Sequence, residues 1–331
     1  MTQETGVTGG RFRLGTRGSP LAIAQAQMVA TALQAAHDLE NVEIVTVQTS
    51  GDRVNDRSLA DLGGKALWTR ELDRALLDGR VEACVHSMKD VETTRSRQIV
   101  VAAMLPRADV RDRLIGAPSI AALPNASVVG TSSPRRAAQL RHWRPDLHIL
   151  PIRGNIATRL GKVDRGDVDA TILAAAGLDR LDQRALGITI PTEIMLPPAG
   201  QGAIGIETLS DSPARSLVAA IDHQATSMCV FVERELLAFL GAGCRSPVGA
   251  LATVDADGLM LRAELLSEDG TIRVHGAMRG ALGFNLAREV ARDLLSRAPP
   301  AILDRLFDSD RRPDIEDASG SQEMMPSPLR M

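Results

Sequence analysis

Arginines gather at one kind of junction in this sequence, where an apolar, strand-like run gives way to a helical pattern. Five of them lie in or just after such junctions: Arg17, Arg135, Arg136, Arg153 and Arg159. A guanidinium pairs with a carboxylate or phosphate through two charge-assisted hydrogen bonds. Proteins of the α/β class bind ligands at the carboxyl ends of their strands. Single surface arginines are common, but five at one edge predict a site for a ligand with several anionic groups.

Asp90 is the carboxylate best placed to act in such a site. It ends the stretch HSMKD, directly after the apolar strand expected at 81–85, and Lys89 precedes it. In an electropositive cleft Asp90 would stay ionised and could stabilise a cationic intermediate or move a proton. A loop ion pair with Lys89 explains the same residues equally well, so the spacing leaves both interpretations open.

Cys244 has a different setting from the other two cysteines. Cys84 is expected within a strand and Cys229 within an apolar helix, where a thiol behaves as a small buried hydrophobe. Cys244 lies in the loop GAGCRSP beside Arg245, and a neighbouring arginine lowers the pKa of a thiol. A cysteine hydrolase would be one use of it, with His86 as a possible partner. The spacing of the three cysteines predicts neither a disulfide framework nor a metal site.

The elements that must position these residues alternate between strand and helix. Strands are expected at 11–14, 42–48, 81–85 and 98–104, with helices after Pro20 and at 66–78. The same alternation restarts with strands at 127–130, 148–152 and 169–177 and a helix after Pro134. This pattern predicts mainly parallel sheets. The first helix begins with Ser-Pro, as does the helix after Pro134, and helix starts of this kind bind anions.

The pattern changes after residue 225. A helix, the GAGCRSP loop, strands near 248–254, 259–266 and 271–278, and a helix at 284–297 predict a small α+β unit. We therefore expect two α/β domains around a cleft and a small α+β C-terminal domain. The predicted limits are 1–105 with 202–221 for domain 1, 106–201 for domain 2, 222–308 for domain 3, and a disordered tail at 309–331.

Composition excludes several classes of protein. The 331 residues carry 38 Lys and Arg against 41 Asp and Glu, a formal charge of −3, which argues against bulk binding to nucleic acid or membranes. No apolar run reaches the length of a membrane span, and the first residues lack the features of a signal peptide. We expect a cytoplasmic protein that acts as a monomer.

Together the loops resemble the porphobilinogen deaminase (hydroxymethylbilane synthase) family. The matching stretches are GTRGSPLA, SGDR, LGGKALW, VHSMKDV, VGTSSPRRAAQL, IRGNIATRL, ILAAAGLDRL, PPAGQGAIGIE and GAGCRSPVGA. The resemblance implies two lobes built like periplasmic binding proteins and a covalent dipyrromethane cofactor joined to Cys244 by a thioether. It also implies a transferase that condenses four porphobilinogen molecules on that primer, releases ammonia, and yields hydroxymethylbilane for haem biosynthesis.

The resemblance assigns roles to individual residues. Asp90 would be the catalytic carboxylate. The residues that would bind carboxylates of the cofactor or substrate are Arg17, Ser19, Lys89, Thr131, Ser133, Arg135, Arg136, Arg153, Gly154, Arg159 and Gln201, with Lys65 and Arg180 as further members. The chain departs from the family at Trp68, where Phe is usual, at Glu92, where Pro is usual, and at Ala108 and Val110, where Glu and Pro are usual.

Two other functions fit parts of the pattern. A solute-binding module would use the same anion-ready loops without chemistry, and a cysteine hydrolase would use Cys244 alone. For an enzyme that holds products of several lengths, we expect domain shifts about hinges near 105–110 and 198–203.

Overall fold

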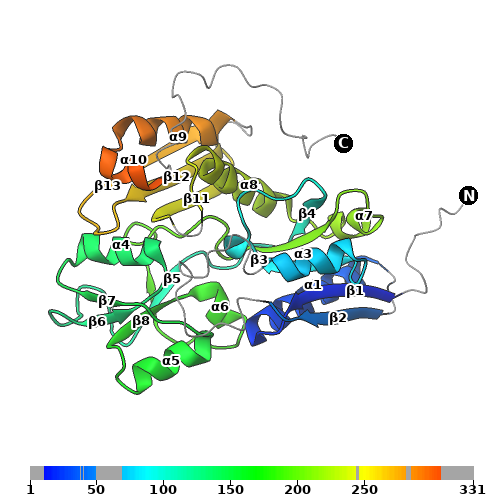
Figure 1. The fold of residues 1–331 in the computed structure, drawn as a ribbon, viewed down its shortest axis with the longest axis horizontal. Helices are drawn as coiled ribbons and strands as arrows, with labels where there is room; N and C mark the ends of the chain where they lie inside the picture. Colours follow the sequence, from blue (N-terminus) through cyan, green and yellow to red (C-terminus); the bar gives the residue numbers. More distant parts are fainter. Residues whose placement is uncertain are drawn as a thin grey trace, which may run out of the picture.

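The computed structural model describes residues 11–37, 39, 41–49, 69–243, 246–280 and 285–306. Its strands form two five-stranded sheets and one three-stranded sheet (Figure 1). Helices pack on each sheet, so the described residues confirm the expected class of two α/β lobes and a small α+β C-terminal domain. None of the helices described combines the length and apolar character that a membrane span requires.

Lobe 1 is built on a sheet with the strand order β2-β1-β3-β10-β4. Its elements are β1 (Arg11–Arg17), α1 (Pro20–Ala36), β2 (Asn41–Val47), α3 (Arg70–Leu77), β3 (Ala83–Ser87), the 3₁₀ turn η2 (Met88–Asp90), β4 (Ile99–Met104), β10 (Ile204–Leu209) and α7 (Ala214–Ala219). Phe12 and Leu14 of β1 are fully buried against Val29 and Leu33 of α1. Alternation along β1 and helical spacing along α1 thus build one apolar core.

Lobe 2 repeats this arrangement with the order β7-β6-β8-β5-β9. Its elements are β5 (Asp112–Ile115), β6 (Val128–Gly130), α4 (Pro134–Trp143), β7 (His148–Leu150), α5 (Ile156–Asp164), β8 (Ala170–Ala174), α6 (Ala175–Asp179) and β9 (Ile188–Ile190). The strand expected at 169–177 ends at Ala174 because the next residues form α6. Strands β5 and β9 were not expected, since each is short and lies beside turn residues.

The expectation of mainly parallel sheets is confirmed, with one reversed strand in each five-stranded sheet. In lobe 1, β1 is parallel to β2 and β3, but β10 is antiparallel to both β3 and β4. In lobe 2, β5 is antiparallel to both β8 and β9. Each antiparallel strand follows a crossing from the other lobe, so it enters its sheet from the end at which the parallel strands finish.

The C-terminal domain packs helices on one face of an antiparallel sheet of order β11-β12-β13. Its elements are α8 (Gln224–Phe239), β11 (Val248–Asp255), β12 (Gly258–Leu266), β13 (Arg273–Gly280), α9 (Asn285–Arg297) and α10 (Pro300–Leu306). Figure 1 shows α8 beside β4 of lobe 1, and α4 of lobe 2 facing this domain. From α8, Arg234 donates to the carbonyl oxygens of Val91 and Glu92 at 3.0 and 2.6 Å.

Two chain segments cross between the lobes, one after β4 and one before β10. The backbone N–H of Ala108 donates to the carbonyl oxygen of Gly202 at 3.1 Å. Gly202 has a φ of +84°, and a Cβ there would lie 2.5 Å from the oxygen of Ala108. Only glycine allows so close an approach with this backbone. The two crossings coincide with the hinges expected near 105–110 and 198–203, and their motion stays a prediction, as do the domain limits.

Candidate functional site

The two Ser-Pro helix starts have the geometry that the sequence predicted. Ser19 accepts a hydrogen bond from the N–H of Ala22 at 3.2 Å, and Ser133 accepts one from the N–H of Arg136 at 3.4 Å. Neither helix carries an acidic residue in its first turn. The positive ends of α1 and α4 are therefore not compensated within their own helices, which favours an anionic ligand nearby.

Asp90 lies in a pocket of lobe 1, between the end of β3 and the start of α1. Its polar lining consists of Arg17, Ser19, Gln25, His86, Ser87 and Asp90. Gln25 is buried and donates from Nε2 to Ser87 Oγ at 2.8 Å. Gln25 and Ser87 were missed by the sequence analysis. The sequence could have indicated them, because Gln25 lies on the apolar side of a predicted helix and Ser87 lies at the end of a predicted strand.

Charges from both lobes act on the same groups around Asp90. Burial lowers the pKa of Lys89 to about 8, while the charge of Asp90 raises it and that of Arg136 lowers it. Burial likewise lowers the pKa of Arg159 to about 10, with Arg136 lowering it and Asp90 raising it. Asp90 and Lys89 belong to lobe 1, and the two arginines belong to lobe 2. The structure thus brings these four predicted residues into one electrostatic environment.

Arg135 and Arg136 are buried at the start of α4 and share one carboxylate, Asp112 of β5. Arg135 Nη2 donates to Asp112 Oδ2 at 2.8 Å, and Arg136 Nη2 donates to Asp112 Oδ1 at 2.7 Å. Arg135 also donates to Gln139 Oε1 and the Leu196 carbonyl at 2.7 and 2.8 Å. Most of the hydrogen-bonding capacity of Arg135 is therefore used inside the protein.

Arg153 and Arg159 flank the start of α5. Asn155 caps this helix by accepting from the N–H of Thr158 at 2.9 Å. Gly154 has a φ of +105°, and a Cβ there would lie 2.6 Å from the side chain of Thr158. The turn at residue 154 therefore requires glycine. Both arginine side chains are partly buried, and Arg159 Nε donates to the Gly154 carbonyl at 3.0 Å.

Gln201 and Arg180 lie at the crossing between the lobes. Gln201 donates from Nε2 to Asp112 Oδ1 at 2.9 Å and to the Val110 carbonyl at 2.7 Å, and its Oε1 lies 3.4 Å from Lys89 Nζ. Arg180 Nη2 donates to the Gly202 carbonyl at 2.6 Å. Its Nε is buried and has no hydrogen-bond partner among the residues that the structure describes.

Thr131 completes the predicted set in lobe 2. It is 2% exposed and follows β6 directly. Its Oγ1 accepts from the backbone N–H of Ser133 at 3.2 Å, which shapes the loop before α4.

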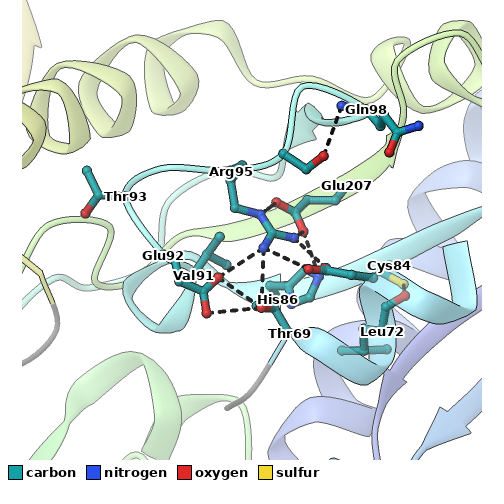
Figure 2. Close-up of polar contacts among 12 residues, drawn as sticks. Thr69, Leu72, Cys84, His86, Val91, Glu92, Thr93, Arg95, Gln98 and Glu207 are labelled. Carbon is teal, nitrogen blue, oxygen red and sulfur yellow. Dashed lines mark hydrogen bonds and ion pairs between the residues drawn. The ribbon is translucent and has the colours of Figure 1, made fainter. Parts of the chain in front are cut away.

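A second buried charged cluster lies behind the pocket of lobe 1. Figure 2 shows Glu207 and Glu92 on different sides of the Arg95 guanidinium, with Thr69 and His86 nearby. Arg95 donates to Glu207 at 2.7 and 2.8 Å and to Glu92 at 3.0 Å. His86 Nε2 lies 3.1 Å from Glu207 Oε2. Burial alone would raise the pKa of Glu207, but the charges and hydrogen bonds of His86 and Arg95 lower it to about 2.

This cluster explains one of the departures from the family pattern. Glu92 accepts from Thr69 Oγ1 at 2.9 Å as well as from Arg95. A proline at position 92 would lack the carboxylate that this guanidinium and hydroxyl share. Arg95 additionally donates to Asp73 at 2.6 Å, so Glu92 belongs to a network that fixes the segment after Asp90.

Several predicted residues cannot be placed. Cys244, Lys65 and Trp68 lie outside the residues that the structure describes. The other two cysteines are buried, as expected. Burial raises the pKa of Cys84 well above its ordinary value and that of Cys229 to about 11, so both thiols are held in the unreactive neutral form.

Comparisons with known proteins agree along most of the chain. Residues 12–216 match the family described as "Porphobilinogen deaminase, dipyromethane cofactor binding domain", and residues 227–296 match "Porphobilinogen deaminase, C-terminal domain". The porphobilinogen deaminase of Sphingopyxis alaskensis is 53% identical over 89% of this chain and 96% of the relative. That of Paracoccus denitrificans is 44% identical over 88% and 96%.

Relatives also include a plant protein. The chloroplastic porphobilinogen deaminase of Oryza sativa subsp. japonica is 42% identical over 89% of this chain and 86% of that protein. Among solved structures, an ABC transporter periplasmic substrate-binding protein from Coxiella burnetii matches 65% of this chain and 94% of its own, at 16% identity and a TM-score of 0.39. That structural likeness is too low to carry an inference about this chain.

Proposed function

This chain belongs to the porphobilinogen deaminase family, and from that premise we propose how its own residues carry out the reaction. The reaction joins four porphobilinogen molecules head to tail on a dipyrromethane primer, releases one ammonia for each, and ends with hydrolysis to hydroxymethylbilane in tetrapyrrole biosynthesis. One observation carries the assignment of roles. Asp90 lines the pocket with Arg17 and Ser19, and its charge acts on Lys89 and Arg159 from the two lobes.

Asp90 is the catalytic carboxylate in this proposal. When ammonia leaves porphobilinogen, the remaining methylene-pyrrole of the incoming substrate is cationic, and a fixed carboxylate stabilises that charge. The same oxygen atoms can take up the proton lost when the new carbon–carbon bond is complete. Position supports both roles, since η2 holds Asp90 at the end of β3, beside Lys89 and within the pocket.

The cations bind the carboxylates of the pyrrole rings. Each porphobilinogen carries an acetate and a propionate, so a growing chain accumulates two negative charges per ring. Its proposed binding residues are those matched to the family: Arg17, Ser19, Lys89, Thr131, Ser133, Arg135, Arg136, Arg153, Gly154, Arg159 and Gln201, with Lys65 and Arg180. The buried Arg180 Nε, which has no partner among the described residues, fits this use because a ligand carboxylate would complete its hydrogen bonding.

Cys244 would hold the dipyrromethane primer through a thioether. When bound, that group supplies the free α-carbon to which new rings attach. Support comes from the sequence, where Cys244 follows Gly243 and precedes Arg245, and from the burial of both other cysteines, which leaves them unsuited to attachment. The donor set of the cleft, rich in guanidinium groups and helix N-termini, fits the carboxylates that the primer carries.

We also infer that the protein acts as a monomer in the cytoplasm and does not bind nucleic acid. Near balance of acidic and basic residues, 41 against 38, supports the absence of bulk polyanion binding. Sedimentation velocity over a hundredfold range of concentration tests the monomer directly. A sedimentation coefficient that rises with concentration would contradict it.

The decisive experiment is the intact mass of the purified protein, followed by peptide mapping of residues 235–250. We expect the added mass of two linked pyrrole units on the peptide that contains Cys244, and no such addition in a Cys244→Ser variant. An unmodified chain that gains no mass after incubation with porphobilinogen would contradict the proposed attachment. The same addition on a peptide that contains Cys84 or Cys229 would contradict it as well.

A further inference from the structure

Asp112 is a buried carboxylate that is neither the proposed catalytic residue nor one of the proposed binding residues. It is 1% exposed and is the first residue of β5, directly after the first crossing between the lobes. Both of its oxygen atoms are used. Oδ1 accepts from Arg136 Nη2 and Gln201 Nε2 at 2.7 and 2.9 Å, and Oδ2 accepts from Arg135 Nη2 and Arg136 Nε at 2.8 and 3.2 Å.

These contacts fix the plane of the Arg136 guanidinium and the direction of the Arg135 side chain. Arg136 meets Asp112 through two nitrogens, and its Nη1 donates to the Ile172 carbonyl at 2.9 Å. A two-point contact determines the orientation of a guanidinium, which a single contact does not. Arg135 is held between Asp112 and the Leu196 carbonyl of the second crossing. Neither side chain could change its direction without breaking a buried ion pair.

The contacts also extend to lobe 1. Gln201 lies in the second crossing, donates to Asp112, and accepts from Lys89 at 3.4 Å. Lys89 immediately precedes Asp90 in η2. Asp112 is thus the common point of a chain of contacts that begins beside the catalytic carboxylate and ends at the start of α4.

We propose that Asp112 is a positioning residue of this enzyme, which orients Arg135 and Arg136 and holds Gln201 against Lys89 so that both lobes present their cations to the ligand carboxylates in one fixed arrangement. The inference rests on the proposed function for the identity of the ligand. In this arrangement Arg135, Arg136 and Lys89 supply the positive charges, and Asp112 determines where those charges lie.

The direction in which the affinity for an anionic ligand changes when the Asp112 carboxylate is removed distinguishes a positioning role from a purely electrostatic one. A carboxylate that acts only through its charge opposes the binding of an anion, so its removal should tighten binding. A positioning carboxylate gives the opposite result, because arginines that lose their orientation bind a carboxylate less well. Misplacement of a binding group by about 1 Å can reduce a rate about 100-fold, so an effect of about 10-fold or more is expected here.

The test uses the full-length enzyme and two variants, Asp112→Asn and Asp112→Glu, with Asp146→Asn as matched control. Asp146 is also a lobe 2 aspartate paired with an arginine, Arg144, but Asp146 lies at the surface and Arg144 is only partly buried. We expect Asp112→Asn to raise the KM for porphobilinogen about 10-fold or more. We expect the same direction for Asp112→Glu, which keeps the charge and moves it by one methylene. The control should match the wild type.

A pH profile gives a readout that loss of stability would not move. The groups that act on Lys89 are Asp90 of its own turn, Arg135 and Arg136 of α4, and Asp112 of β5. The charge of Asp112 raises the pKa of Lys89, so Asp112→Asn should move the alkaline fall of kcat/KM to lower pH. Asp112→Glu should leave its position unchanged, since the negative charge is retained.

Either of two kinetic results would overturn the inference: a KM for Asp112→Asn at or below that of the wild type, or wild-type kinetics in Asp112→Glu. If Asp112→Asn does not fold, the Glu variant decides alone. Calorimetric titration with benzenehexacarboxylate, a simple polycarboxylate probe, separates this inference from the proposed function. An enzyme inactive on porphobilinogen would refute the proposed function, whereas equal probe affinity in wild type and Asp112→Asn would refute only the positioning role.

Discussion

The two lobes share a strand order and a Ser-Pro helix cap, yet each contains a charged cluster whose net charge is opposite in sign to that of the other. In lobe 1 one guanidinium, that of Arg95, meets three carboxylates. In lobe 2 one carboxylate, that of Asp112, meets two guanidiniums. The first cluster therefore carries an excess of negative charge and the second an excess of positive charge.

The difference shows how one architecture supports two tasks. In lobe 1 His86 Nε2 lies 3.1 Å from Glu207 Oε2, so a second nitrogen-bearing side chain of the protein faces this carboxylate besides Arg95. In lobe 2 the excess positive charge acts on Lys89 and Arg159, which belong to the proposed ligand site. The lobe 1 cluster is completed within the protein, whereas we propose that an anionic ligand completes the lobe 2 cluster.

The largest expected effect is on kcat, and it distinguishes the proposed catalytic carboxylate, Asp90, from the carboxylates of the lobe 1 cluster. Asp90→Asn should lower kcat by about 100-fold to 10,000-fold, the range for removal of a positioned acid–base group, with little loss of stability. Glu92→Gln is the matched control, since it removes a carboxylate two residues away that only contacts Arg95 and Thr69. It should keep most of the turnover. Near-normal turnover of Asp90→Asn would refute the catalytic assignment.

The lobe 1 cluster should matter for stability. Glu207→Gln should lower the free energy of unfolding by about 3 kcal/mol, the lower end for a broken buried ion pair, because Asp73 and Glu92 still contact Arg95. Urea denaturation measures the loss. Glu193→Gln removes the exposed partner of Arg262 and should change the free energy by less than about 0.5 kcal/mol. Equal effects of both variants would mean that burial of Glu207 contributes nothing.

Glu207 and Lys89 should change the free energy of unfolding in different ranges of pH. The pKa of Glu207 is depressed from 4.5 to about 2, so its stabilising contribution is present above pH 4.5 and is lost as the pH falls towards 2. The pKa of Lys89 is depressed from 10.5 to about 8. Burial of its charged form therefore costs stability below pH 8, and that cost disappears as the pH rises towards 10.5.

Denaturation curves from pH 2 to 10 test both ranges, and stability should rise with pH in each. Glu207→Gln should remove part of the acidic loss, and Lys89→Met should remove part of the alkaline gain. A Lys89→Met protein with an unchanged slope above pH 8 would show that Lys89 does not titrate there.

The smallest effect concerns the caps that the lobes share. Ser19→Ala and Ser133→Ala should each cost about 1 kcal/mol of stability, because each removes one hydrogen bond to a helix N-terminus. Thermal unfolding of both variants measures the two costs under the same conditions. A clearly larger loss at position 133 would mean that the cap also supports the arginine pair that follows it.

Much of the site was predictable because its residues sit in local patterns. Ser19, Pro20 and Ser133 predicted the two helix starts, and their caps are confirmed. The family resemblance identified the enzyme class, which removes the solute-binding module and the cysteine hydrolase as alternatives. The roles of the individual residues stay predictions.

Contacts between distant segments could not be read in the same way. Asp112 lies 23 and 24 positions from its arginines, and Arg95 lies 112 positions from Glu207. No periodicity links such residues, since the sheet order alone brings them together. The short strands β5 and β9 were missed for a related reason. The neighbouring strands of the sheet hold each of them in place, and a segment of three or four residues is too short for the alternation of apolar and polar residues to indicate a strand.

The contact between α8 and the segment after Asp90 has a consequence for the length of the product. Arg234 holds the carbonyls of Val91 and Glu92, and Thr93 Oγ1 donates to the Ala242 carbonyl at 3.4 Å. Cys244 follows Ala242 by two residues in the sequence. If the primer is attached at Cys244 as proposed, this tie would limit how far its anchor can move from Asp90. Each added ring would then require the growing chain to fold back upon itself or the protein to widen.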